Sequence, residues 1–330
     1  MPDSSRRKFT QVLAHLRDEG RPLPGFELYH LSDLDRQELA LLEAVWPEIP
    51  LARRRSIVQD LADITEANFE VNFGSVFRLG LEDDDAEVRA TSINGLWEEE
   101  DPKLIAPLID FLHHDPDPGV RAAAASALGR FVYLGEIEEI PESHLRRIES
   151  GLLAVITAGE NEPEVRRHAL EAIAFSGRDE VPPLIEAAYV STEPKFKVSA
   201  LFAMGRSADK RWTPQVLAEL ESDASEFRFE AARAAGELEL REAVPALAQL
   251  AEDGDQQVRE AAIWSLGQVG GPEARQVLDD LLFQAEDEED KEFIEEALEN
   301  LDFTDDVQGF TLLAFDEDDE DDEEDKSYLN

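Results

Sequence analysis

The amino-acid sequence predicts an all-α fold, an α-solenoid in which antiparallel helical hairpins stack into a right-handed superhelix. The first observation is the stretch Val258–Gly271, whose apolar residues recur at the three-and-four spacing of one helical face. Gly270 and Gly271 end this helix, and Pro272 suits the first turn of the next. The next helix has an apolar face of its own, so the two helices form a hairpin.

A basic residue at one fixed place in the hairpin recurs along the chain, which is the second observation. The markers are Arg54, Arg89, Arg121, Arg166, Lys197, Arg228, Arg259 and Lys291. Five of the seven intervals are 31 or 32 residues, one is 35 and one is 45. A regular period of this length is typical of a repeat array, in which each unit buries its apolar face against its neighbours.

The markers themselves are open to two interpretations. They lie early in the first helix of each hairpin, close to aspartate-rich turns, so they can bond carboxylates or carbonyls of adjacent units. Because identical positions are what stacking requires, we interpret them as a structural ladder. The alternative is a basic stripe that binds a ligand.

Two stretches carry a resemblance to a known repeat family. Asp115–Gly129 (DPDPGVRAAAASALG) and Asp253–Gly267 (DGDQQVREAAIWSLG) resemble HEAT-like repeats, in the short bacterial form found in phycobilisome-lyase-type proteins. The resemblance covers roughly Ile49–Asp302 and implies a HEAT-like, armadillo-like solenoid, but it leaves the activity open. It implies a bilin-lyase-like or chaperone-lyase activity as one alternative.

Two other HEAT-like families fit the sequence poorly. The deoxyhypusine hydroxylases hold iron with His-Glu dipeptides, and none of the six histidines in this chain is followed by glutamate. HEAT-like DNA glycosylases use a basic concave face, whereas this chain is acidic throughout.

The chain divides into four parts on these patterns. Residues 1–48 are expected to be N-terminal helices that cap the array: a helix over Ser4–Arg17, a loop over Arg21–His30, and a helix from Ser32 to Val45. Residues 49–302 are expected to form about seven or eight repeats, with a longer insert near 131–144. This insert either projects from the array or packs along it, or it is only a longer turn or an extra helical turn. Residues 303–315 read as an apolar linker, and 316–330 as a disordered acidic tail.

Charge narrows the range of partners. Seventy-six acids face 31 bases, which gives a net charge of −45. Ten consecutive acids in the tail, with one lysine, account for −9, so the remaining 315 residues carry −36. Such a field repels nucleic acid and anionic membranes and attracts basic proteins. An adaptation to high internal salt explains the same composition.

The cysteine count and the hydropathy of the sequence bear on the cellular compartment of the protein. The sequence has no cysteine, so it offers no disulfide, thiolate nucleophile or cysteine-bound zinc. No apolar run reaches the roughly 20 residues that span a bilayer, and the N-terminus has no secretory leader pattern. We therefore expect a cytoplasmic protein.

The sequence contains no clear motif for catalysis or for metal binding, and we predict no catalytic residue, cofactor or metal. No phosphate-binding glycine loop or nucleophile-elbow motif occurs. His113-His114-Asp115 is a conceivable metal site, but a turn between helices explains it better.

A protein-interaction scaffold therefore fits the sequence best, with the second helices of the hairpins expected to line a concave, partner-binding surface. The partner is expected to be a protein with a basic surface or segment. An acidic mimic that sequesters nucleic-acid-binding proteins is a further alternative. Candidate contacts are Trp212, the apolar residues Phe310, Leu312, Leu313 and Phe315, and the acids Asp316, Glu317, Asp318, Asp319 and Glu320.

Overall fold

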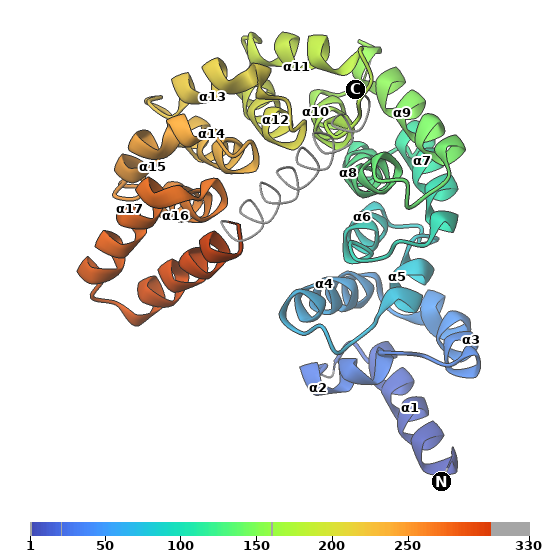
Figure 1. The fold of residues 1–330 in the computed structure, drawn as a ribbon. Helices are drawn as coiled ribbons and strands as arrows, with labels where there is room; N and C mark the ends of the chain where they lie inside the picture. Colours follow the sequence, from blue (N-terminus) through green and yellow to red (C-terminus); the bar gives the residue numbers. More distant parts are fainter. Residues whose placement is uncertain (1, 21, 160, 305–330) are drawn as a thin grey trace, which may run out of the picture. The chain divides into compact units, whose positions relative to one another are not determined.

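A computed structural model describes residues 2–20, 22–159 and 161–304, with helical backbone over most of them and no strand within these ranges. The sequence therefore predicts the fold class correctly: the chain is an all-α solenoid of stacked helices (Figure 1). Contacts divide the chain into two compact units, unit 1 (Met1–Ser176) and unit 2 (Gly177–Asn330).

Unit 1 contains ten α-helices in its described part. They are α1 (Pro2–Arg17), α2 (Gly25–Leu28), α3 (Arg36–Val45), α4 (Leu51–Ala67), α5 (Gly74–Gly80), α6 (Ala86–Gly95), α7 (Ile105–His114), α8 (Pro118–Glu136), α9 (Glu142–Thr157) and α10 (Pro163–Ile173). Short 3-10 helices η1 (Tyr29–Leu31), η2 (Trp46–Glu48) and η3 (Pro102–Leu104) join some of them.

Unit 2 continues the same alternation. Its helices are α11 (Val181–Tyr189), α12 (Pro194–Arg206), α13 (Thr213–Glu219), α14 (Ser225–Glu237), α15 (Val244–Leu250), α16 (Gln256–Val269) and α17 (Gly271–Gln284), with η4 (Lys210–Trp212) and η5 (Arg241–Ala243) between them. Residues 288–304 are helical as well. Second helices begin at Val181, Thr213, Val244 and Gly271, each with proline in its first turn, and the start at Gly271 is the one that Pro272 predicts.

Each unit is built from two layers of helices. The helices that carry the basic markers pack on one another, α4 on α6 on α8 on α10 in unit 1 and α12 on α14 on α16 in unit 2. The alternate helices form the other layer, in which α7 packs on α9 and α15 on α17. A valine precedes four of the markers and is central to this packing: Val88, Val120, Val165 and Val258 are fully buried. A repeat thus buries its apolar faces against its neighbours.

The N-terminal segment differs from the sequence prediction in two places. The stretch predicted as a loop, 21–30, contains α2 and the start of η1, because Pro24 sets the extended backbone from which α2 begins. The cap of α3 is Asp35 and not Ser32. Its carboxylate accepts the Glu38 N–H, and the Glu38 side chain accepts the Asp35 N–H in return, which is a capping box.

The insert near 131–144 lengthens helices. The helix α8 runs for 19 residues and α9 for 16, and Glu138 takes a left-handed backbone conformation (φ 64°) in the turn between them. The residues of the insert therefore lie in the end of α8, in this turn and in the start of α9.

The sequence analysis expects the second helices of the hairpins to line the concave face, but in unit 2 the first helices, which carry the basic markers, lie there. Figure 1 shows α12, α14 and α16 on the inner side of this unit's curve and the proline-started helices α11, α13, α15 and α17 on the outer side. The physical reason lies in the hairpin: the marker helices approach one another closely through small residues such as Gly205 and Gly236, so their layer is the tighter one. The four-part division by residue number and the handedness of the superhelix stay predictions.

Candidate partner-binding surface

The basic markers bond the turn that precedes their own helix. In four repeats the Nη1 group donates to the backbone carbonyl six residues earlier. The pairs are Arg89 to Asp83 (2.9 Å), Arg121 to Asp115 (3.0 Å), Arg228 to Ser222 (2.9 Å) and Arg259 to Asp253 (2.8 Å). These turn carbonyls lack a partner within a helix, so the guanidinium supplies one.

Several markers also bond a carboxylate in the turn of the following hairpin. Arg89 makes two parallel bonds to Asp115, of 2.9 and 3.0 Å, and Arg228 makes two to Asp253, of 2.8 and 2.9 Å. Arg54 lies 2.8 Å from Asp83. Bidentate pairs of this kind fix both distance and orientation, so each one holds two successive hairpins in register.

The turn aspartates organise the start of the next helix as well. The Asp253 carboxylate accepts the N–H of Asp255, and Asp255 in turn caps α16 through the N–H of Gln257. Asp115 and Asp117 repeat this arrangement at α8. Each D-x-D turn therefore joins a helix cap to an inter-repeat ion pair.

The remaining basic markers bond different partners. The Lys197 ammonium lies 2.6 Å from Glu219, which also accepts the Tyr189 hydroxyl at 2.7 Å. Burial, and then the bond to Glu219, raise the pKa of Tyr189 to about 12. Arg166 donates to the Ile156 carbonyl, and Lys291 pairs with Glu288 within its own helix.

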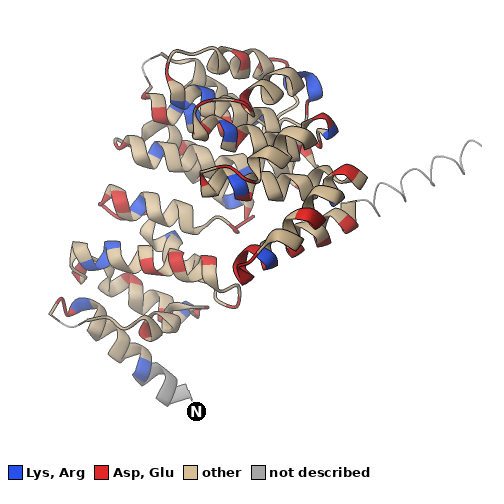
Figure 2. Ribbon diagram, turned by 90° about the vertical axis from the view of Figure 1, so that its left-hand side faces the viewer, with Lys and Arg blue, Asp and Glu red and all other residues tan. Residues whose placement is uncertain are grey.

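Many of the described arginines bond inside the repeats, as in the pairs Arg89–Asp115 and Arg228–Asp253. Acids outnumber bases in the sequence, 76 to 31. Figure 2 shows acids distributed over the turns and helix surfaces, with far fewer basic positions among them. The last described helix, 288–304, carries acids along most of its exposed length.

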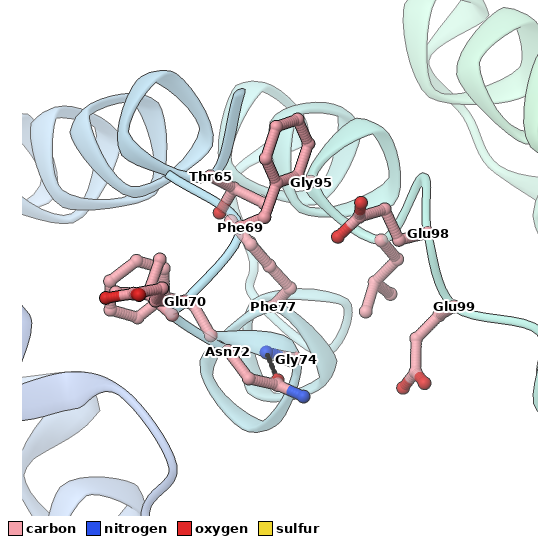
Figure 3. Close-up of a pocket in the computed structure, with 12 residues that line it drawn as sticks. Thr65, Phe69, Glu70, Asn72, Gly74, Phe77, Gly95, Glu98 and Glu99 are labelled. Atoms are coloured by element: carbon pink, nitrogen blue, oxygen red, sulfur yellow. Dashed lines mark hydrogen bonds between the residues drawn. The ribbon is translucent and has the colours of Figure 1, made fainter. Parts of the chain in front are cut away.

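A pocket of about 310 Å³ lies in unit 1 (Figure 3). Phe69 and Glu70, on the connection between α4 and α5, line it from one side, and Glu98 and Glu99, on the turn after α6, line it from the other. Its apolar side is formed by Phe73, Phe77 and Leu96, and its remaining lining residues are Thr65, Val71, Asn72, Gly74 and Gly95. Phe69 is 76% exposed, and few large apolar residues of the described chain are as exposed.

The sequence-predicted contact residues do not gather in this pocket. Trp212 is 4% exposed at the start of α13, so little of its ring is available to a partner. Phe310, Leu312, Leu313, Phe315 and the acids of the tail lie outside the described residues.

The two adjacent histidines take part in ordinary local contacts. The His114 ring lies 2.9 Å from Asp110, one helical turn earlier, and Asp115 is bonded by Arg89. Burial lowers the pKa of His113. Within the described ranges, no three side chains of metal-ligand type are grouped to hold an ion, and no helix there is long and apolar enough to cross a membrane.

The comparison with known protein families finds a match in the repeats. The family model for HEAT repeats matches residues 75–142 and 213–299, one stretch in each unit. The matched stretches contain the bidentate pairs of Arg89 and Arg228. The chain therefore contains HEAT-like repeats in both of these stretches.

Solved structures match the chain at low identity. Yeast importin-β (Kap95p) matches at 15% identity over 89% of this chain and 46% of its own, with a TM-score of 0.49. The CpcE–CpcF complex of phycocyanin lyase from Nostoc sp. PCC7120 matches at 18% over 69% and 94%, with a TM-score of 0.45. Human deoxyhypusine hydroxylase matches at 18% over 81% and 96%, with a TM-score of 0.35. Likeness at this level carries no argument about function, and no curated protein matches the sequence.

Reasoning from the sequence does not find the pocket of this HEAT-like protein. The available signal is the longer interval between Arg54 and Arg89, 35 residues against the usual 31 or 32, which marks an enlarged connection. The exposure of Phe69 and the position of Glu98 opposite it depend on how that connection folds.

Proposed function

We propose that this HEAT-like repeat protein is a non-enzymatic protein-interaction scaffold whose partner has a basic surface or segment. Stacked helical repeats expose an extended surface suited to binding other proteins. The observation that carries the proposal is the distribution of charge. The repeats use their arginines internally, in pairs such as Arg89–Asp115 and Arg228–Asp253, so the uncompensated charge that faces solvent is acidic.

Electrostatics gives the proposal a measurable consequence. A strongly acidic surface speeds the encounter with a basic protein and disfavours acidic ones. Because exposed charges are screened beyond about 8 Å at physiological ionic strength, such a complex weakens as salt is added.

The test is affinity capture from native lysate. The full-length protein and a version that ends at Phe315 serve as baits, each is washed at low and at high salt, and the retained proteins are identified by mass spectrometry. The proposal predicts a defined basic partner held by both baits and released at high salt. Partners that are no more basic than the lysate, or no specific partner, contradict it.

Two other outcomes would redirect the assignment. Nucleic-acid-binding proteins held only by the full-length bait would favour an acidic mimic that acts through Asp316–Asp325. A bait that emerges coloured, or that alters the absorbance of an added bilin, would favour a lyase-like activity.

A further inference from the structure

The last described helix (288–304) carries a leucine that is less covered than its counterparts in the earlier repeats. In those repeats the residue seven positions after the basic marker is at most 5% exposed. These residues are Leu61, Leu96, Leu128, Ile173, Met204, Ala235 and Leu266. Leu298 follows Lys291 by the same seven positions and is only half-buried. The described part of the last repeat therefore lacks an element that covers this position in the others.

A leucine of α17 is less covered in the same way. In four earlier repeats the residue 23 positions after the marker, near the end of the second helix, is at most 6% exposed. These residues are Phe77, Leu112, Leu220 and Ala251. Leu282 holds this position after Arg259 and is half-buried. The helix α17 lies beside the last described helix, where Arg275 pairs with Asp302 (Figure 1). The two half-buried leucines thus lie on neighbouring helices at the end of unit 2.

The position of Leu298 on its helix shows which kind of element is missing. Ala297 meets Gly267 of the preceding first helix, so it marks the side toward that helix. Glu299 takes the place where four earlier repeats have the glycine that faces the following first helix. Leu298 lies between these two sides, at a position that the earlier repeats bury, so it points to the layer of second helices.

Glu299 also shows that the array ends here. The glycines at this position allow a following first helix to approach, whereas Glu299 is an exposed, charged side chain. A glutamate there keeps a further first helix away and gives the array the polar end that repeat proteins need. The missing cover of Leu298 is therefore a second helix and not a further repeat.

The sequence that follows the last described helix repeats the pattern of a second helix. Lys291 comes 63 residues after Arg228, and the same shift compares the end of the chain with α15. It aligns Val307, Phe310, Leu313 and Ala314 with Val244, Leu247, Leu250 and Ala251. The four residues of α15 and its C-terminal cap are all buried. Two further matches follow in the turn, Asp316 with Asp253 and Asp318 with Asp255.

We propose that residues 307–315 dock as the second helix of the last repeat and cover Leu282 and Leu298. Val307 follows the last described residue, Thr304, by three positions, which is enough chain for the short turn of a helical hairpin. Docking transfers the apolar side chains of the segment from water onto the two leucines, which stabilises both. On this assignment residues 307–315 complete the array and are not a linker.

Docking also extends the ladder of ion pairs by one step. Lys291 and Asp316 are 25 residues apart, as are Arg228 and Asp253, which form a bidentate pair. In the docked state Asp316 accepts a bond from Lys291 across the last hairpin. The run of acids that begins at Asp316 then starts from the turn side of the array.

The same register divides the apolar residues that the sequence suggests as partner contacts. Phe310 and Leu313 lie against the hairpin in the docked state, whereas Leu312 and Phe315 stay on its outer side. The counterparts of this outer pair in the repeat of Arg228, both exposed, are Gln249 and Glu252. Only Leu312 and Phe315 then remain open to a partner. Docking needs no partner, so it is independent of the scaffold proposal.

Amide hydrogen exchange of the full-length chain, followed by mass spectrometry, measures the docking. A helix of nine residues is not stable alone in water, so residues 307–315 exchange slowly only if they are docked. We expect their amides to exchange at least about tenfold more slowly than those of an unstructured peptide. Exchange at the rate of an unstructured peptide overturns the proposal.

Two adjacent leucines provide a matched pair of variants. Leu313→Ser removes a side chain that faces the hairpin and is expected to abolish the slow exchange of residues 307–315. Leu312→Ser makes the same change on the outer side and is expected to leave the exchange within about twofold of wild type. Leu298→Ser, on the receiving side, should act like Leu313→Ser. Equal effects of the two tail variants contradict the docked register.

Sedimentation at several protein concentrations identifies the hairpin that is covered. Slow exchange in a monomer, independent of concentration, supports docking within one chain. Slow exchange that appears only as a dimer forms means that the segment covers the last hairpin of a second copy, and it overturns the proposal. Capture of a basic partner is a separate result, so the scaffold proposal can fail or hold independently.

Discussion

Asp253 accepts bonds from three directions. Its carboxylate receives two bonds from Arg228 of the preceding repeat and one from the N–H of Asp255, and its carbonyl receives Arg259. The Arg228 hydrogen bond, the largest influence, holds the pKa of Asp253 below its usual value of 3.8, and the same pair raises the pKa of Arg228. This one residue, in the turn after α15, thus connects α14 to the start of α16.

Removing the guanidinium from this site should destabilise unit 2. Arg228→Ala leaves Asp253, whose side chain is 12% exposed, without its ion-pair partner, and it frees the Ser222 carbonyl. We expect the free energy of unfolding, from urea denaturation, to fall by about 2 kcal/mol. The control is Lys210→Ala, an exposed cation for which the described structure shows no partner, expected to stay within about 0.5 kcal/mol of wild type. Equal effects of the two would show that the pair contributes no stability.

The same pair gives a pH dependence with a definite sign. Because the folded-state pKa of Asp253 lies below its unfolded value of about 3.8, its stabilisation is complete above that pH. The stabilisation is lost as the pH falls through the folded-state pKa. The difference in unfolding free energy between wild type and Arg228→Ala should therefore shrink from pH 5 to pH 3. A difference that stays constant or grows over this range contradicts the assignment.

At the scale of elements, glycines set the approach of the marker helices. Gly205, Gly236 and Gly267 are 31 residues apart, and each faces backbone of the next helix in its layer. A methyl group would lie 2.9 Å from the Cα of Ala234 at Gly205, 2.9 Å from the Cα of Ser265 at Gly236, and 2.6 Å from the Ala297 carbonyl at Gly267. In unit 1, Gly129 meets Ala172 in the same way. The absent side chains allow close packing within this layer.

A single methyl group should therefore disturb the stack. Gly236→Ala is expected to lower the free energy of unfolding by about 1 kcal/mol or more, since overpacking outweighs the higher helix propensity of alanine. Gly254→Ala, where no atom lies within 4 Å of the added carbon, should leave stability nearly unchanged. Calorimetry of both variants compares them. Gly236→Ala as stable as wild type would mean that the two helices separate at little cost.

The sequence predicts these elements well and the sites poorly, for a physical reason. The 31-residue spacing and the prolines at 182, 214, 245 and 272 locate helices because both signals are local. The short helix α2, the burial of Trp212 and the pocket beside Phe69 depend on how distant segments meet. Glycine at a 31-residue spacing was available as a signal for close helix approach, but the pattern alone does not say which atoms approach.

At the scale of the whole molecule, charge is the dominant property. The net charge of −45 makes the folded chain repel itself, and the internal pairing of arginines leaves that repulsion on the surface.

Added salt should consequently stabilise the isolated protein. Screening reduces repulsion between exposed carboxylates, so we expect the melting temperature to rise steadily between low and near-molar sodium chloride. Glucose at matched osmolality serves as an uncharged control. A melting temperature that is constant or falls with salt would show that the surface acids are locally compensated.

Salt should have the opposite effect on binding, and this tests the scaffold assignment most directly. The measurement is the dissociation constant of the most strongly captured partner for the full-length chain, by titration calorimetry over a series of salt concentrations. Association through the acidic surface predicts that the dissociation constant rises progressively as salt is added. A constant value across the series would contradict the claim that this protein recognises its partner through surplus surface acid.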